Sequence, residues 1–134
     1  MSQENVEAVA AAFDAFAHGG REGLAQHWTD DIKHRALEGA PDDHGPMHGK
    51  DALRAYVQDW LDMFDDFKGE PVELIDAGGD EVVAVIRVSG RAKLSGAETE
   101  MTFAAVYTIR EGKIADGREY ATRDEALEAA GLEE

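Results

Sequence analysis

Residues 51–64 read DALRAYVQDWLDMF, and this stretch decides how the rest of the chain is interpreted. Its large apolar side chains recur at intervals of three and four residues: Leu53, Tyr56, Val57, Trp60, Leu61 and Phe64. This spacing places them on one face of an α-helix. The stretch therefore predicts a long helix that buries a broad aromatic stripe.

After this helix, the pattern changes to that of β-strands. Four segments rich in β-branched and aromatic residues follow, over 72–77, 81–93, 98–110 and 113–121. Short turns that contain glycine separate them, which predicts successive antiparallel hairpins. Thr122 and Glu125 then form a capping-box pattern, which predicts a last helix over 123–130.

The residues before 51–64 predict further helices and one strand. Apolar residues at helical spacing favour a helix over 3–18, which Gly19 and Gly20 end, and a shorter helix over 21–28. A short strand is expected over 32–37. Residues 38–49 contain three glycines and two prolines and predict a loop, and loops of this length often cover a site.

The composition favours one folded domain. The chain has 134 residues, a net charge of −16 and 43% hydrophobic residues. This is enough apolar material for a single core and too much for a disordered acidic tail. We expect a single domain over 1–134 of the α+β class, in which helices cover one face of a bent sheet.

The composition also excludes several classes of function. The acid excess is spread over both halves of the chain, so no basic face for nucleic acid is expected. No long apolar run or signal-like start is present, which predicts a cytoplasmic protein without a membrane partner. The chain lacks cysteine, and it lacks the motifs of serine hydrolases, nucleotide hydrolases and dinucleotide-binding proteins. No cofactor is predicted.

Several short motifs occur in a characteristic order along the whole chain: Phe13-x-x-Phe16, Trp28, Gly49-Lys-Asp-Ala-Leu53, Glu111-Gly-Lys-Ile114 and Glu125-Ala-Leu-Glu-Ala-Ala-Gly-Leu132. Together they resemble the SnoaL-like branch of the NTF2-like superfamily. The resemblance implies a cone in which a curved sheet wraps the long helix, encloses an apolar pocket and supports a homodimer. Because this fold hosts isomerases, polyketide cyclases, dehydratases, epoxide hydrolases and non-catalytic modules, it does not select a function.

Glu119 is the first candidate for a catalytic residue. On the last strand, Ala115, Gly117, Glu119 and Ala121 share one face, so small residues surround one carboxylate. The resemblance aligns Glu119 with the acid that serves as general base in polyketide cyclases and limonene-type epoxide hydrolases. The alternative is that Glu119 is a solvated acid on an exposed sheet face.

Arg87 and His34 complete the predicted catalytic set. Where the epoxide hydrolases carry Arg-x-Asp, this chain has Arg87-Val88-Ser89, and where they carry Tyr-x-Asn it has His34-Arg35-Ala36. These departures disfavour epoxide hydrolysis. The remaining set predicts that Glu119 moves a proton while His34 or Tyr120 donates a hydrogen bond to a developing enolate. Arg87 and Glu119 could equally form an ion pair that has only a structural role. His34 could equally be a half-exposed histidine on a strand, without a role in catalysis.

The expected wall of the pocket is mostly aromatic. The candidate substrate-binding residues are Trp28, Tyr56, Trp60, Phe64, Ser89, Phe103 and Tyr120. His44 and His48 lie in the loop at a spacing that matches no known ligand pattern, so no metal site is expected. Apolar residues of the strands, Val82, Ile86, Phe103 or their neighbours, are expected on the outer face of the sheet, where a second copy would cover them.

The sequence therefore predicts a homodimeric protein with a pocket for a small apolar molecule, cyclic or polyketide-like. Isomerase, cyclase or hydratase chemistry at Glu119 is one interpretation. A non-catalytic ligand-binding or dimerisation module on the same fold is the other.

Overall fold

The computed structural model describes residues 2–37 and 45–132. Within these ranges the elements are, in chain order, α1 (Ser2–Ala25), β1 (Trp28–Arg35), β2 (Met47–His48), α2 (Lys50–Met63), β3 (Phe64–Asp76), β4 (Glu81–Ala92), β5 (Glu98–Arg110), β6 (Lys113–Tyr120) and α3 (Arg123–Ala129). None of the helices in these ranges has both the length and the apolar character that a membrane span requires.

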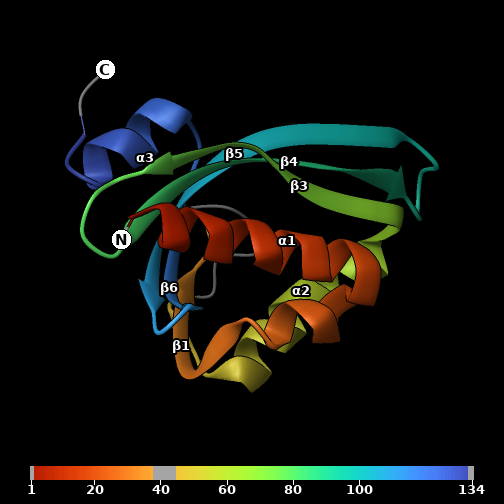
Figure 1. Ribbon diagram of the computed structural model, residues 1–134. Coiled ribbons are helices and arrows are strands. Elements are labelled where there is room, and N and C mark those ends of the chain that lie inside the picture. The colour runs from red at the N-terminus through yellow and green to blue at the C-terminus, as the bar shows by residue number, and fades with distance from the viewer. Residues whose placement is uncertain (1, 38–44, 133–134) are drawn as a thin grey trace.

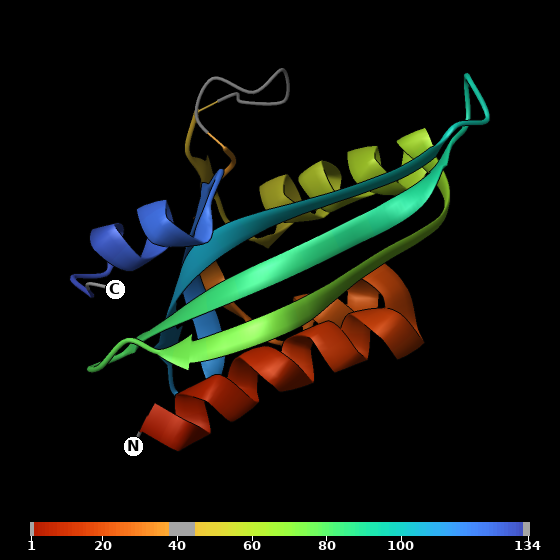
Figure 2. The same ribbon diagram turned by 90° about the horizontal axis from the view of Figure 1, so that it is seen from above.

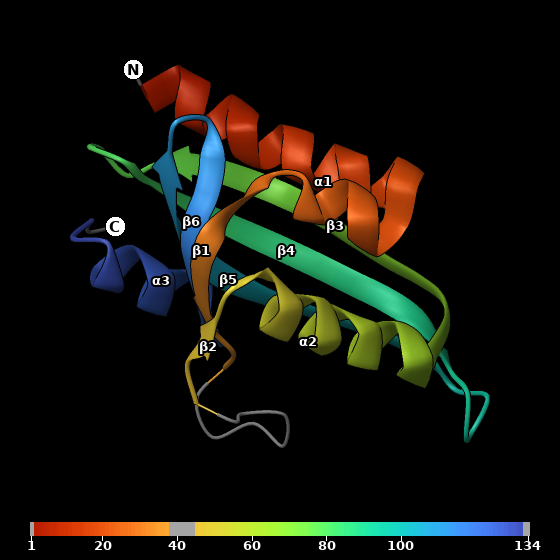
Figure 3. The same cartoon turned by 90° about the horizontal axis from the view of Figure 1, so that it is seen from below.

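The strands form one curved sheet in the order β2-β1-β6-β5-β4-β3. β1 runs parallel to β6, and the other neighbours are antiparallel. Figure 1 shows that β1 and β6 descend steeply from the strands β3 to β5, which gives the sheet a concave side. Helices α1 and α2 lie side by side in this concavity (Figure 3), and α3 lies on the opposite side of the sheet (Figure 2). The predicted α+β cone is confirmed.

Helix α1 unites the two helices expected before residue 28. The chain does break at Gly20, whose φ of 63° and ψ of −151° are not helical. Glycine accepts this positive φ at little cost because it has no Cβ. The second helix nevertheless ends earlier than expected, and Trp28 begins β1 instead.

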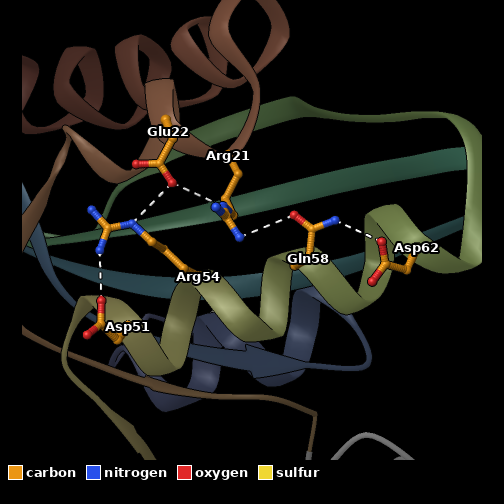
Figure 4. Close-up of polar contacts among 6 residues, drawn as sticks. All are labelled: Arg21, Glu22, Asp51, Arg54, Gln58 and Asp62. Atoms are coloured by element: carbon orange, nitrogen blue, oxygen red, sulfur yellow. Dashed lines mark hydrogen bonds and ion pairs between the residues drawn. The ribbon is translucent and has the colours of Figure 1, made fainter.

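A polar network fixes the end of α1 after Gly20 against α2. Figure 4 shows its side chains: Arg21, Glu22, Asp51, Arg54, Gln58 and Asp62. Arg54 of α2 lies 3.2 Å from the carboxylate of Glu22, and Arg21 donates a 3.2 Å hydrogen bond to Gln58. Because α2 also carries Tyr56 on its cavity side, this network helps to fix the position of that residue.

Strand β3 is longer than the predicted strand over 72–77, because it begins at Phe64. The first half of β3 was not predicted as a strand because it contains acidic residues, Gly69 and Pro71. In the structure, its register against β4 shifts twice. β3 is the edge strand of the sheet. Proline is tolerated there because no further strand needs its missing N–H. β1 likewise begins and ends earlier than the expected strand over 32–37.

The two faces of the sheet carry different parts of the core. Val82 and Ile86, at 0% and 2% exposure, pack on the concave side with the helices, and Phe103 packs against the same cluster. Val82, Ile86 and Phe103 therefore do not lie on the outer face, because the strand alternation places them inward and turns their neighbours outward. On the outer face, α3 covers the buried residues of a second cluster, among them Val83 and Val106.

Helix α3 begins as predicted. The Thr122 side chain accepts a 3.1 Å hydrogen bond from the Glu125 N–H, and the Glu125 carboxylate accepts one from the Thr122 N–H at 3.2 Å. Arg123 donates two further hydrogen bonds to Glu73 of β3, which hold the pKa of that carboxyl below its usual range. The predicted loop over 38–49 lies mostly outside the described residues, and its last part includes β2.

Candidate functional site

An apolar cavity of about 120 Å³ lies between the concave face of the sheet and the helices α1 and α2. Apart from Gly69, His34 and Glu119, every described residue that lines it is aromatic or aliphatic. The predicted lining residues Trp28, Tyr56, Trp60 and Phe103 are among them. A cavity of about 150 Å³ in another protein holds benzene, so this cavity has room for a molecule of roughly one ring.

Glu119 and His34 meet at the wall of this cavity. His34 Nε2 lies 2.7 Å from Glu119 Oε2, and the two side chains are only 9% and 11% exposed. Because an ionised carboxylate only accepts hydrogen bonds, the imidazole N–H is the donor. The parallel pairing of β1 with β6 creates this contact, since it places His34 directly beside Gly117, two residues before Glu119.

Tyr56 of α2 reaches the same carboxylate from the other side of the cavity. Its hydroxyl donates to both oxygens of Glu119, at 3.1 Å to Oε2 and 3.2 Å to Oε1. Among the described residues, Oε2 thus accepts from His34 and Tyr56, whereas Oε1 accepts only the longer branch of the Tyr56 bond. Oε1 is therefore the oxygen with a lone pair left for a ligand.

Gly117 provides the space in which the His34 ring lies. A Cβ atom at this position would stand 2.7 Å from His34 Nδ1 and 3.0 Å from the ring of Tyr107. Both distances are too short for unstrained contact, so the two rings can occupy these places only because residue 117 has no side chain. The small residue noted beside Glu119 in the sequence thus has a definite structural role.

We expect Gly117→Ala to displace His34 from Glu119 and to reduce the free energy of unfolding by about 1–3 kcal/mol, as overpacking does. Urea unfolding measures the loss, and NMR measures the loss of the hydrogen-bonded His34 Nε2–H signal. Gly19→Ala is the control, because a Cβ there meets nothing within 4 Å. An unchanged His34 signal in Gly117→Ala would contradict the packing described here.

The structure does not bring Arg87 to this site. Arg87 points to the outer face of β4, where it donates a 2.8 Å hydrogen bond to Glu70 of β3 and lies 3.9 Å from Glu100 of β5. These two carboxylates raise the pKa of the Arg87 guanidinium. Ser89 shares the outer face with Arg87 and does not line the cavity. The predicted pairing of Arg87 with Glu119 is therefore wrong, because the polar side of β4 is its outer side.

Two predicted aromatic residues also lie elsewhere. Tyr120 follows Glu119 on β6, so its side chain points to the outer face, where it packs with the residues under α3. It is not available as a hydrogen-bond donor in the cavity. Phe64 begins β3 and stacks on Trp60, with 5.9 Å between the ring centroids, outside the residues that line the cavity.

Tyr107 is a polar cavity residue that the sequence interpretation missed. It lies on β5 and is 8% exposed. Burial, and to a lesser degree the negative charge of Glu119, raise the pKa of its hydroxyl far above the ordinary value. The signal was present in the sequence, because residues 103, 105 and 107 share one face of the strand, and Phe103 had already been assigned to the pocket.

No metal site is found in the parts of the chain that the structure describes, since no group of three or more His, Asp or Glu side chains gathers there. His44 lies outside these residues. The polar side chains that meet at the cavity wall are a carboxylate, one imidazole and one phenol.

This combination of cone fold and lined cavity defines a protein of the NTF2-like superfamily. More specifically, the family model of the SnoaL-like domain matches residues 9–117, and the chain belongs to this family. Glu119 lies just beyond the matched range. Among curated proteins, none is similar enough to this chain to count as a match.

Solved structures with the same fold cover almost the whole chain. An NTF2-like protein from Burkholderia xenovorans is 28% identical, with a TM-score of 0.71 and 97% of each chain covered. A candidate polyketide cyclase from Xanthomonas campestris is 18% identical, with a TM-score of 0.72 and coverage of 96% of this chain and 97% of that one. A Mycobacterium tuberculosis protein in complex with estradiol-17beta-hemisuccinate is 18% identical, with a TM-score of 0.73 and coverage of 89% and 94%.

Proposed function

We propose that this protein binds a small, largely apolar cyclic molecule in the cavity and moves a proton on it, with Glu119 as the general base. One observation carries the proposal: a nearly buried carboxylate, held by His34 and Tyr56, presents one oxygen to an apolar cavity. The relatives that are crystallised with small molecules or named for cyclase activity support it as neighbours of the same fold.

The geometry suits abstraction of a proton from carbon. The hydrogen bonds from His34 and Tyr56 fix the carboxylate, so that no reorientation is needed when a ligand arrives. The apolar walls exclude water, which would otherwise compete for Oε1. Isomerase, cyclase and hydratase reactions all begin or end with such a proton transfer, and the proposal covers this group of reactions rather than one of them.

Deuterium exchange tests the proposal without knowledge of the natural substrate. Phenylacetone is a single-ring ketone whose acidic α-protons exchange with D₂O when a base removes them. We expect the protein to accelerate this exchange over an equal concentration of free acetate, as followed by proton NMR. Binding without acceleration would favour the non-catalytic ligand-binding module instead.

We also propose that the protein is a cytoplasmic homodimer, in which two copies pair through the outer sheet face that α3 leaves uncovered. This face carries both signs of charge, Arg87 beside Glu70 and Glu100. In a twofold interface any contact between an arginine of one copy and a glutamate of the other occurs twice, which suits a face that carries both charges. We expect sedimentation at twice the chain mass of 14.5 kDa. A monomer at micromolar concentration would contradict the dimer.

A further inference from the structure

A surface groove of about 580 Å³ adjoins the cavity between α1, the end of α2 and the edge strand β3. Helix α1 runs alongside β3 (Figures 2 and 3). Among the described residues, the two helices contribute only uncharged ones to the groove: Phe16, Ala17, Gly20 and Leu61. Leu61 belongs to the apolar stripe of α2 but does not line the cavity. The proposed function leaves the groove and Leu61 without a role.

The groove and the cavity share three lining residues: Phe16 of α1, and Phe67 and Gly69 of β3. The two rings meet edge-on, with 6.2 Å between their centroids and 78° between their planes. Beside them, a Cβ atom at Gly69 would lie 3.6 Å from Val88 and 3.9 Å from Phe16. These are ordinary contact distances, so any longer side chain would take up the space between the two hollows. Because residue 69 has no side chain, a ligand chain meets only backbone there.

The groove adjoins the end of the cavity that is remote from Glu119. Glu119 lies on β6, whereas Gly69 lies on β3, and the strands β5 and β4 separate the two. Three spacings of about 4.8 Å between neighbouring strands amount to about 14 Å along the sheet. A single ring at Glu119 does not span this distance, whereas a ring that carries a chain does.

We infer that the groove binds an apolar chain carried by the ring compound of the cavity, so that the ligand is a ring with an alkyl chain opposite its reacting group. The inference rests on the proposed function for the position of the ring, and it adds a second subsite and a narrower class of substrate. The chain leaves the cavity over Gly69 and lies between α1 and α2, against Ala17 and Leu61. Each methylene group that is fully buried there strengthens binding by up to about fourfold.

The charges of the groove favour an uncharged chain. Its charged residues, Asp66, Lys68 and Glu70, lie at alternate positions of β3 and carry both signs. Glu70 already accepts a 2.8 Å hydrogen bond from Arg87. A charged chain end of either sign would meet like charge as well as opposite charge, whereas an alkyl chain gains from contact with the apolar residues of the helices.

Two ring ketones of different length test the inference. Phenylacetone occupies the cavity alone, whereas 4-hexylphenylacetone carries a hexyl chain on the far side of its ring. We expect wild type to bind the hexyl compound at least about tenfold more tightly, as measured by calorimetric titration. Leu61→Ala should weaken binding of the hexyl compound about three- to tenfold, because it removes apolar contacts in the groove, and should leave the affinity for phenylacetone within about twofold.

Leu94→Ala is the matched control for Leu61→Ala. Leu94 is fully exposed in the turn between β4 and β5, and it lines neither the cavity nor the groove. The same truncation there should leave both affinities unchanged.

NOE contacts locate the chain in the wild-type complex, so the test does not depend on the folding of Leu61→Ala. The terminal methyl group of the hexyl chain should show contacts to the methyl groups of Ala17 and Leu61. Their absence would overturn the inference.

The affinities distinguish the failure of this inference from the failure of the proposed function. If the hexyl compound binds no more tightly than phenylacetone, or if its advantage is the same in wild type and Leu61→Ala, the groove subsite is wrong and the role of Glu119 is unaffected. If the chain occupies the groove but α-proton exchange is not accelerated, Glu119 is not the base and the groove subsite stands. If neither ketone binds to wild type, both proposals fail.

Discussion

Glu119→Gln is expected to slow the exchange of phenylacetone α-protons by about 100-fold or more, the usual contribution of a general base. An amide cannot accept a proton from carbon at neutral pH, although it still fits the space and accepts from Tyr56. Affinity for the ketone should therefore stay within about threefold of wild type, since only one hydrogen bond to the site is altered.

Glu128→Gln provides the matched control for this result. Glu128 lies exposed on α3, and the same chemical change there leaves the cavity untouched. It should exchange phenylacetone at the wild-type rate. Equal exchange rates for wild type and Glu119→Gln would show that Glu119 is not the general base. Ligand binding would then remain as the function of the cavity.

Ile86→Ala is expected to reduce the free energy of unfolding by about 2–5 kcal/mol. Ile86 is 2% exposed and packs in the concave core at the wall of the cavity. Truncation removes its contacts and leaves a larger void, because the surrounding strands cannot collapse completely. Domains of this size have total free energies of unfolding of about 5–15 kcal/mol. The expected loss is a large share of that total, and urea unfolding can measure it.

The neighbouring Arg87→Ala tests the assignment of faces in β4. The Arg87 side chain is 45% exposed and its ion pairs lie at the surface, where such pairs contribute little. The free energy of unfolding should fall much less in Arg87→Ala than in Ile86→Ala. The rate of α-proton exchange should not change. A larger loss for Arg87→Ala than for Ile86→Ala would reverse the inner and outer faces assigned to β4.

Local signals in the sequence predicted most of the elements. The aromatic stripe of α2 and the capping box of α3 depend on residues three and four apart, and both elements end within one residue of their expected bounds. β4 and β5 follow the turns predicted around them. The first half of β3 was missed because an edge strand tolerates residues, such as Pro71, that a central strand excludes.

The site was harder to predict because it depends on which strand face turns inward. Alternation showed that Ile86 and Arg87 lie on opposite faces but not which of the two is buried. An arginine was accepted as an inward residue on the strength of a family position, and the structure pairs it with surface carboxylates instead. Glu119 and His34 both line the cavity, although the parallel pairing that joins them has no local signal in the sequence.

The parallel pairing of β1 with β6 also bears on how the chain folds. His34 and Glu119 are 85 positions apart, so their contact closes a loop that contains more than half of the chain. Contacts of such separation form late, since the loss of chain entropy precedes any gain from the contact. We therefore expect partly folded chains to hold hairpins while the contact between His34 and Glu119 is absent, so that the polar end of the cavity forms only with the completed fold.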